Sequence, residues 1–179
     1  MHHCVSAAGV YANEMNYLIT AIFGKKALQQ LSSGDYVDWA GEMLVQGYDS
    51  RSLRILAGLD RFVSTFEAED YFVRAITELN LTLPDSDTAI RAYACAIARQ
   101  IIEEKITAKD GVRALFKICI AAEYARDFII WLELDDALDS LLSGNHPFTY
   151  ESATLENFDD IAKREAANFI AAVCPKPAS

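Results

Sequence analysis

The sequence predicts an all-α protein, an irregular bundle of about seven or eight helices built from αα-hairpins. Apolar residues recur at helical spacing along nearly the whole chain, and no segment keeps the two-residue alternation of a half-buried strand. Eight Gly and four Pro are too few for a chain of many β-turns. With 52% hydrophobic residues the chain has ample material for a core, and we expect a single helical domain over 1–179.

The N-terminal part is expected to hold a loose leader followed by two helices. Residues 1–13 are more polar and less periodic than the residues after them, and no basic region precedes their apolar patch, so no signal peptide is predicted. A helix is expected over about 14–31, ended by a Ser-Ser-Gly turn. Asp35 is the expected N-cap of the next helix, which ends at Gly47.

Three helices are expected in the middle of the chain. Ser50 is the expected N-cap of a short helix that ends at Gly58, and Phe66 lies near the start of the next one. The Pro-Asp-Ser-Asp segment 84–87 is a strong start signal for the third. Four apolar residues of that helix share one face at spacings of four, three and four: Ile90, Ala94, Ile97 and Ile101.

The C-terminal part is expected to hold three helices, one capped by Thr107, one over about 125–144 and one over about 154–173. The segments 35–60 and 88–120 both read as αα-hairpins with an Ala-rich first helix. They are interpreted either as a decayed repeat or as two ordinary hairpins. Two copies are fewer than a solenoid requires, so ordinary hairpins are favoured.

The negative charge is concentrated in one segment. The chain carries a net charge of −10, and 127–162 hold nine acidic residues and no Lys or Arg. This balance argues against nucleic acid as a partner, because binding to phosphates requires clustered basic residues. No apolar run reaches the length of about 18 residues that spans a membrane. The acids are Asp127, Glu133, Asp135, Asp136, Asp139, Glu151, Glu156, Asp159 and Asp160.

A helical wheel of 126–142 places acids on one side and apolar residues such as Trp131 on the other. The acidic side has no basic residue one turn away to relieve repulsion, and the next loop offers aromatic residues suited to a partner's pocket. Solubility explains such a face equally well. The candidate partner-binding residues are Glu133, Asp135, Asp136, Asp139, Phe148, Tyr150, Glu156, Asp159 and Asp160.

No motif points to an enzyme, a cofactor or a metal site. The chain has no Gly-rich phosphate loop, no nucleophile elbow and no Glu-x-x-His pair, and His146, in a Gly-Asn-His-Pro loop, is interpreted as a solvated or capping residue. The acidic pairs near 67–70 and 103–104 are interpreted as helix-end charges. Four scattered cysteines predict reduced thiols and a cytoplasmic location.

The segment from Trp39 to Leu59, with Gly47-Tyr48-Asp49-Ser50 at its turn, resembles small helical bacterial proteins of toxin-immunity loci, such as contact-dependent growth-inhibition immunity proteins. The resemblance implies an immunity protein that neutralises a cognate toxin in the cytoplasm. A basic, nuclease-like toxin domain is the expected partner, because an acidic surface can block a groove that binds phosphates.

Two other functions are compatible with the sequence. A helical enzyme or small-ligand protein would need a pocket between helices, lined by polar groups such as Tyr93, Arg99 and Glu123. A transcriptional regulator would need a basic face, for which three side chains are available: Lys109, Arg113 and Lys117.

Overall fold

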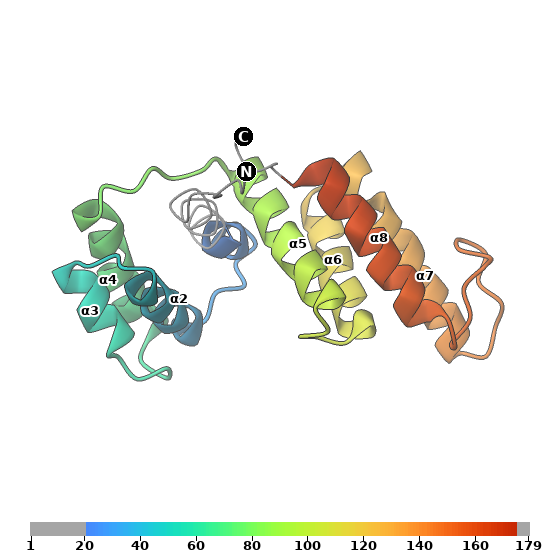
Figure 1. Cartoon of the computed structure of the whole chain (residues 1–179), viewed down its shortest axis with the longest axis horizontal. Coiled ribbons are helices and arrows are strands. Elements are labelled where there is room, and N and C mark those ends of the chain that lie inside the picture. Colours follow the sequence, from blue (N-terminus) through green and yellow to red (C-terminus); the bar gives the residue numbers. More distant parts are fainter. Residues whose placement is uncertain (1–20, 175–179) are drawn as a thin grey trace, which may run out of the picture. The chain divides into compact units, whose positions relative to one another are not determined.

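The computed structural model describes residues 21–174, whose regular secondary structure is entirely helical, with no strand, as the sequence predicts (Figure 1). Residues 21–27 are helical and belong to the first expected helix; the rest of that helix before residue 21, and the expected leader 1–13, lie outside the described residues. The remaining elements are α2 (Ser33–Val45), α3 (Arg51–Ala57), α4 (Thr65–Glu78), α5 (Ser86–Ile102), α6 (Ala108–Ala121), the 3₁₀ turn η1 (Arg126–Phe128), α7 (Ile129–Leu142) and α8 (Phe158–Val173).

The chain forms two compact units, unit 1 over Met1–Ala89 and unit 2 over Ile90–Ser179, which are described separately. The single domain expected over 1–179 stays a prediction. No helix among the described residues is long and apolar enough to cross a bilayer.

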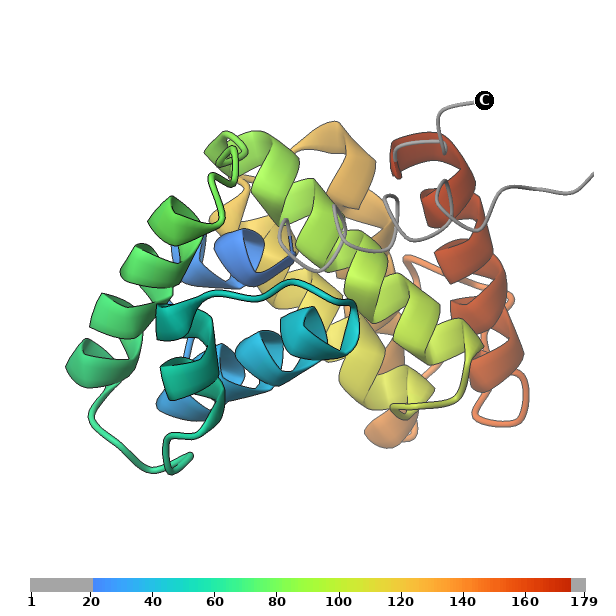
Figure 2. The same cartoon turned by 60° about the vertical axis from the view of Figure 1, so that its left-hand side comes forward.

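Unit 1 is organised around the ring of Phe72 on α4. Tyr36 and Trp39 from α2 and Phe23 from the preceding helical turn lie with their ring centroids 5.0, 4.8 and 5.4 Å from it. Such tilted and edge-on pairs are favourable beyond the apolar area that they bury. Helices α2, α3 and α4 all pack against one another around this cluster (Figure 2).

The N-caps of α2 and α3 are both serine residues. Ser32, not Asp35, is the N-cap of α2; Asp35 occupies the third helical position and completes a capping box with it. The prediction that Asp35 is the N-cap was therefore wrong by three residues. Ser50 caps α3 as predicted, with Oγ 3.2 Å from the Leu53 N–H.

A carboxylate from α4 adds a second cap to α3. Glu78 accepts hydrogen bonds from the Ser52 hydroxyl at 2.6 Å and from the Ser52 backbone N–H at 2.9 Å. These bonds, the hydroxyl first, lower the pKa of Glu78 to about 2, so the carboxylate stays charged at the N-terminus of α3, where the helix dipole favours it. A residue 26 positions away thus fixes α3 against α4.

The predicted start signals of α5 and α6 are both confirmed. The Asp85 side chain accepts the Thr88 N–H at 2.9 Å at the start of α5, and Thr107 accepts the Asp110 N–H at 3.1 Å at the start of α6. Helix α6 packs against α7 and α8, which also contact each other. The core between them contains the fully buried rings of Phe128 and Trp131, with Phe169 close to both.

The contact between α5 and α6 depends on a glycine. A Cβ added to Gly111 would lie 2.3 Å from Cγ1 and 2.6 Å from Cδ1 of Ile101, and 3.2 Å from Cδ1 of Ile106. Ile101 is 1% exposed and belongs to the predicted apolar face of α5. Glycine therefore allows the backbone of α6 to approach this face more closely than any other residue would.

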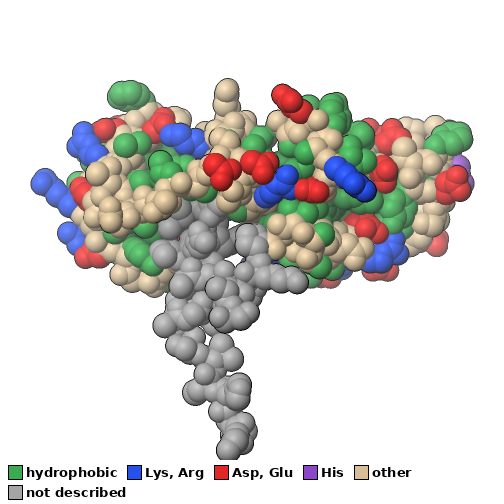
Figure 3. All heavy atoms as spheres, turned by 90° about the horizontal axis from the view of Figure 1, so that it is seen from above, with side chains coloured by type: hydrophobic (Ala, Val, Ile, Leu, Met, Phe, Trp, Pro, Cys, Tyr) green, Lys and Arg blue, Asp and Glu red, His purple; other side chains and the backbone are tan. Residues whose placement is uncertain are grey.

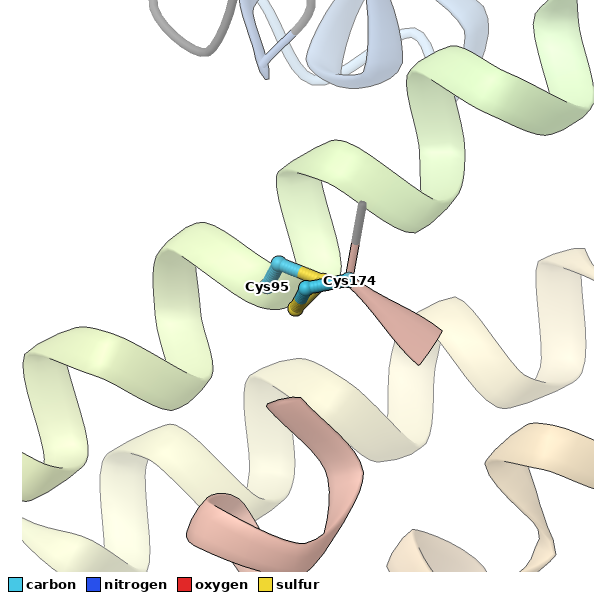
Figure 4. The surroundings of a disulfide bond; sticks show 2 residues. All are labelled: Cys95 and Cys174. Atoms are coloured by element: carbon cyan, nitrogen blue, oxygen red, sulfur yellow. A yellow bond between two sulfur atoms is a disulfide. The ribbon is translucent and has the colours of Figure 1, made fainter. Parts of the chain in front are cut away.

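Cys95 and Cys174 form a disulfide between the middle of α5 and the C-cap of α8 (Figure 4). The two Cα atoms are 6.0 Å apart, within the usual span for a disulfide. The prediction that the cysteines are all reduced is therefore wrong for this pair; Cys119 is free and buried. Spacing along the chain could not reveal the pair, because its members are 79 residues apart and only the packing of α8 brings them together.

Candidate partner-binding surface

Salt bridges from outside the acidic segment neutralise part of it. Asp127 pairs with Arg91 of α5, and Asp139 pairs with Arg113 of α6, with Nη2 and Oδ1 2.7 Å apart. On the face seen in Figure 3, acidic side chains (red) accordingly lie next to basic ones (blue). The six acids of the segment that have no salt bridge to any described residue are Glu133, Asp136, Glu151, Glu156, Asp159 and Asp160.

Asp135 does not lie on the exposed acidic face that the helical wheel indicates. Its side chain is 8% exposed, and its Oδ1 atom is buried without a hydrogen-bond partner. Burial raises the pKa of the Asp135 carboxyl, and the charges of Asp139 and Asp136 add to this effect, whereas Arg113 opposes it. The Nε1 atom of Trp131, one turn earlier, is also buried without a partner. Asp135 thus belongs to the interior of unit 2, and the wheel was wrong about it.

An Asp135→Asn variant should be more stable than the parent at neutral pH, by about 1 kcal/mol, because a buried charge without a full set of partners is costly. The pKa of Asp135 is higher in the folded than in the unfolded chain. The parent should therefore lose stability as the pH rises from the ordinary carboxyl pKa through the raised one. Urea unfolding between pH 4 and pH 7 measures both effects.

The chain offers a matched control and a reporter for this measurement. Asp136 is exposed on the same helix, and Asp136→Asn should change stability by less than about 0.5 kcal/mol at either pH. Each unit contains one of the two tryptophans, so a Trp39→Phe background leaves Trp131 to report on unit 2 alone. Equal effects of the two Asn substitutions would contradict the assignment of Asp135 to the interior.

The loop 143–157 between α7 and α8 is long but well anchored (Figure 1). Pro147 and Ala153 are buried, and the Thr149 hydroxyl donates to the Glu133 carbonyl oxygen at 2.9 Å. Before α8, the Asn157 side chain accepts the Thr154 N–H at 2.7 Å and donates to the Ser152 carbonyl at 2.9 Å. The path of the loop is therefore fixed by contacts at several points.

Phe148 lies between two of these anchors and is 91% exposed. Leu142 at the end of α7 and Leu155 farther along the loop are 54% and 56% exposed. Hydrophobic and carboxylate side chains lie together at the right-hand end in Figure 3, the end that the α7–α8 loop occupies in Figure 1. An exposed aromatic side chain on a fixed loop, near acids without basic partners, has the features of an interaction site.

Tyr150, also predicted to contact a partner, has a hydroxyl that is already engaged. It donates to Oε1 of Glu165 on α8 at 2.7 Å and accepts a hydrogen bond from Arg164. Burial, and then the hydrogen bond to Glu165, raise the pKa of the tyrosine. The hydroxyl of Tyr150 therefore anchors the loop to α8, and Phe148 is the aromatic side chain that the loop leaves free for a partner.

The residues that could serve a catalytic, metal-binding or DNA-binding function are His146, the acidic residues and the basic side chains of α6. His146 is exposed, with Nδ1 2.9 Å from the Pro147 carbonyl oxygen. Within 21–174, no three His, Cys, Asp or Glu side chains lie close enough to hold a metal ion. Lys109 and Lys117 are exposed on α6, but Arg113 between them is paired with Asp139, which reduces the positive charge of that stripe.

A shallow groove of about 620 Å³ lies in unit 1, between α2 and α3. Its lining includes none of the three polar residues expected for a ligand pocket, Tyr93, Arg99 and Glu123. Glu123 is exposed just after the end of α6.

The comparisons with protein families, with curated proteins and with solved structures find no match for this chain. The resemblance of Trp39–Leu59 to immunity proteins therefore stays a prediction. The candidate surface rests on its geometry and charge alone.

Proposed function

We propose that this protein binds and inhibits a basic protein partner through unit 2, as an immunity protein that neutralises a nuclease-like toxin domain. The binding surface consists of Phe148, Leu142 and Leu155 together with the six unpaired acids. The observation that carries the proposal is the fixed presentation of Phe148, which is 91% exposed while the residues on both sides of it are anchored.

Rigid presentation of an apolar anchor favours tight binding. A loop that is already ordered in the free protein loses little conformational entropy when the partner binds, so more of the contact energy appears as affinity. Aromatic side chains at the centre of an interface are among the residues whose loss costs most. A Phe side chain that stays 91% exposed in the described structure is consistent with this role.

The unpaired acids supply the electrostatic part of the proposal. Carboxylates that form no salt bridge within the described residues raise the negative potential at the surface, which accelerates the encounter with a basic partner. An acidic surface can also occupy the basic groove in which a nuclease binds phosphates. In this picture the charges set the rate of association and Phe148 sets the rate of dissociation.

A cytoplasmic location belongs to this proposal. The expectation rested on reduced cysteines, and the Cys95–Cys174 disulfide is instead typical of proteins from oxidising compartments. Cell fractionation followed by thiol labelling without reductant tests the location. Recovery of the protein in the cytoplasmic fraction supports it, and recovery only in an extracytoplasmic fraction contradicts it.

Phe148→Ala should weaken binding to the purified product of the adjacent gene by about 30-fold, because loss of an interface anchor costs about 2 kcal/mol. Calorimetry or surface plasmon resonance measures the change. Phe62 is the matched control, since it is 95% exposed but lies in unit 1. Equal losses for Phe148→Ala and Phe62→Ala, or no binding by the parent, would overturn the proposal.

Reversal of Glu151 and Glu156 to Lys should lower the association rate by about tenfold at low salt and less at high salt. Both acids are exposed and without a salt bridge, so their reversal breaks no internal contact. Asp139 is left unchanged, because its reversal would break the pair with Arg113. An association rate that is the same for the parent and the double variant at every salt concentration would exclude the acidic loop from the interface.

A further inference from the structure

The groove in unit 1 follows two adjacent rows of residues along α2. One row, with residues four apart, carries Asp38, Glu42 and Gln46; the other carries Val37, Gly41 and Val45. Ala57 of α3 forms part of the opposite wall. From Val37 to Gln46 the groove extends about 13 Å along the helix axis. It is therefore a two-sided feature, with small or apolar groups along one side and polar groups along the other. Of the two carboxylates on the polar side, Asp38 is already paired with Arg61 and Glu42 is not.

The apolar row leaves room for another chain. A Cβ added to Gly41 would meet no atom of the described residues within 4 Å, so none of them covers the backbone of α2 at the centre of the groove. Val45, one turn later, is 89% exposed and lies in the same row. Helices approach each other most closely where one of them carries a small residue, and an amphipathic helix in a groove is a common mode of peptide recognition.

The polar row indicates the charge of the occupant. Glu42 has no salt bridge with any described residue, and burial together with the nearby charge of Asp38 raises the pKa of its carboxyl. Oε1 of Gln46 is buried and accepts no hydrogen bond. The last turn of α2 holds no basic residue to complement the negative end of the helix dipole. A cationic side chain beside Glu42 would pair with its carboxylate and would complement the negative end of the helix dipole.

From this geometry we infer that the α2–α3 groove is a docking site for a basic amphipathic helix of a partner protein, with its apolar side chains over Gly41 and Val45 and an arginine or lysine beside Glu42. This site belongs to unit 1 and is independent of the Phe148 surface, so either proposal can fail without the other.

The probe is a synthetic amphipathic helix of leucine and arginine, about 14 residues and 21 Å long, titrated into the full chain. The same helix with glutamate in place of arginine should not bind. Gly41→Leu, which fills the groove without changing its charge, and Glu42→Lys should each weaken binding about tenfold or more. Because Gly41 faces open space in mid-helix, Gly41→Leu is expected to fold.

Two matched variants separate the groove from the general acidity of the chain. Glu67→Lys makes the same charge reversal on α4, and Ala167→Leu adds the same side chain at an exposed position of α8; each should change binding less than twofold. The proposal is overturned by equal weakening in Glu42→Lys and Glu67→Lys, by unchanged binding in Gly41→Leu, or by binding of the glutamate helix. Binding of butylguanidinium but not of the helix would also overturn it, in favour of a site for small cations.

Discussion

Unit 2 should lose about 4 kcal/mol of stability when Cys95 and Cys174 are both replaced by alanine. A disulfide stabilises a fold chiefly by restricting the unfolded chain, and this one closes a loop with a sequence separation of 79 residues. Both cysteines are buried, so the substitutions also remove packed sulfur atoms from the interior. Urea unfolding followed by the fluorescence of Trp131, in a Trp39→Phe background, measures the loss.

Reductant provides the control for this prediction. Dithiothreitol should destabilise the parent by a similar amount but leave the double alanine variant unchanged. Cys119→Ala, which removes a buried free thiol, should cost less and leave the response to reductant intact. Among the three cysteines of the described residues, alkylation in denaturant without reductant should label Cys119 but not Cys95 or Cys174. Labelling of all three would show that the bond is absent.

The second large effect is expected at the contact of α6 with α5. Gly111→Ala should destabilise unit 2 by about 1 to 3 kcal/mol, although alanine is the better helix former, because the added methyl group overlaps the buried side chain of Ile101. Ile101 is β-branched and packed on all sides, so it cannot rotate away freely. Unfolding followed by Trp131 fluorescence again measures the loss.

Gly41→Ala is the matched control, since it makes the same chemical change in a helix where the new methyl group meets no atom of residues 21–174 within 4 Å. It should stabilise the protein by about 0.5 to 1 kcal/mol. Combining Gly111→Ala with Ile101→Ala should cost less than the sum of the two single losses, because alanine at 101 lacks both Cγ1 and Cδ1, the two overlapping atoms. Equal effects of alanine at the two glycines would contradict the close approach of α6 to α5.

Local chemistry decided most of the secondary structure and could be predicted from the sequence. Ser50 and Thr107 cap the helices that they were expected to cap, and Asp85 of the expected start signal 84–87 bonds to the first turn of α5. Each of these side chains bonds to a backbone N–H only a few residues away. The misplacement of the α2 cap from Ser32 to Asp35 has the same origin. Both residues belong to one capping box, and the pattern alone did not distinguish their roles.

The acidic surface was only partly predictable. The concentration of acids in 127–162 is a property of the sequence, and so is the aromatic loop that contains Phe148. A helical wheel, however, considers one helix at a time. It could not show that Arg113 of α6 pairs with Asp139, or that packing in unit 2 buries Asp135.

The sequence by itself therefore determined the all-α class, most of the helix starts and the location of the negative charge, because each depends on residues close together in the chain. Only the tertiary structure decided the Cys95–Cys174 pair, the approach of Gly111 to Ile101, the burial of Asp135 and the free position of Phe148. The first two join residues distant in the chain, and the last two depend on how neighbouring elements cover a side chain. The neighbouring helices therefore decide which acidic residues of α7 are exposed and unpaired, because packing buries Asp135 and Arg113 pairs with Asp139.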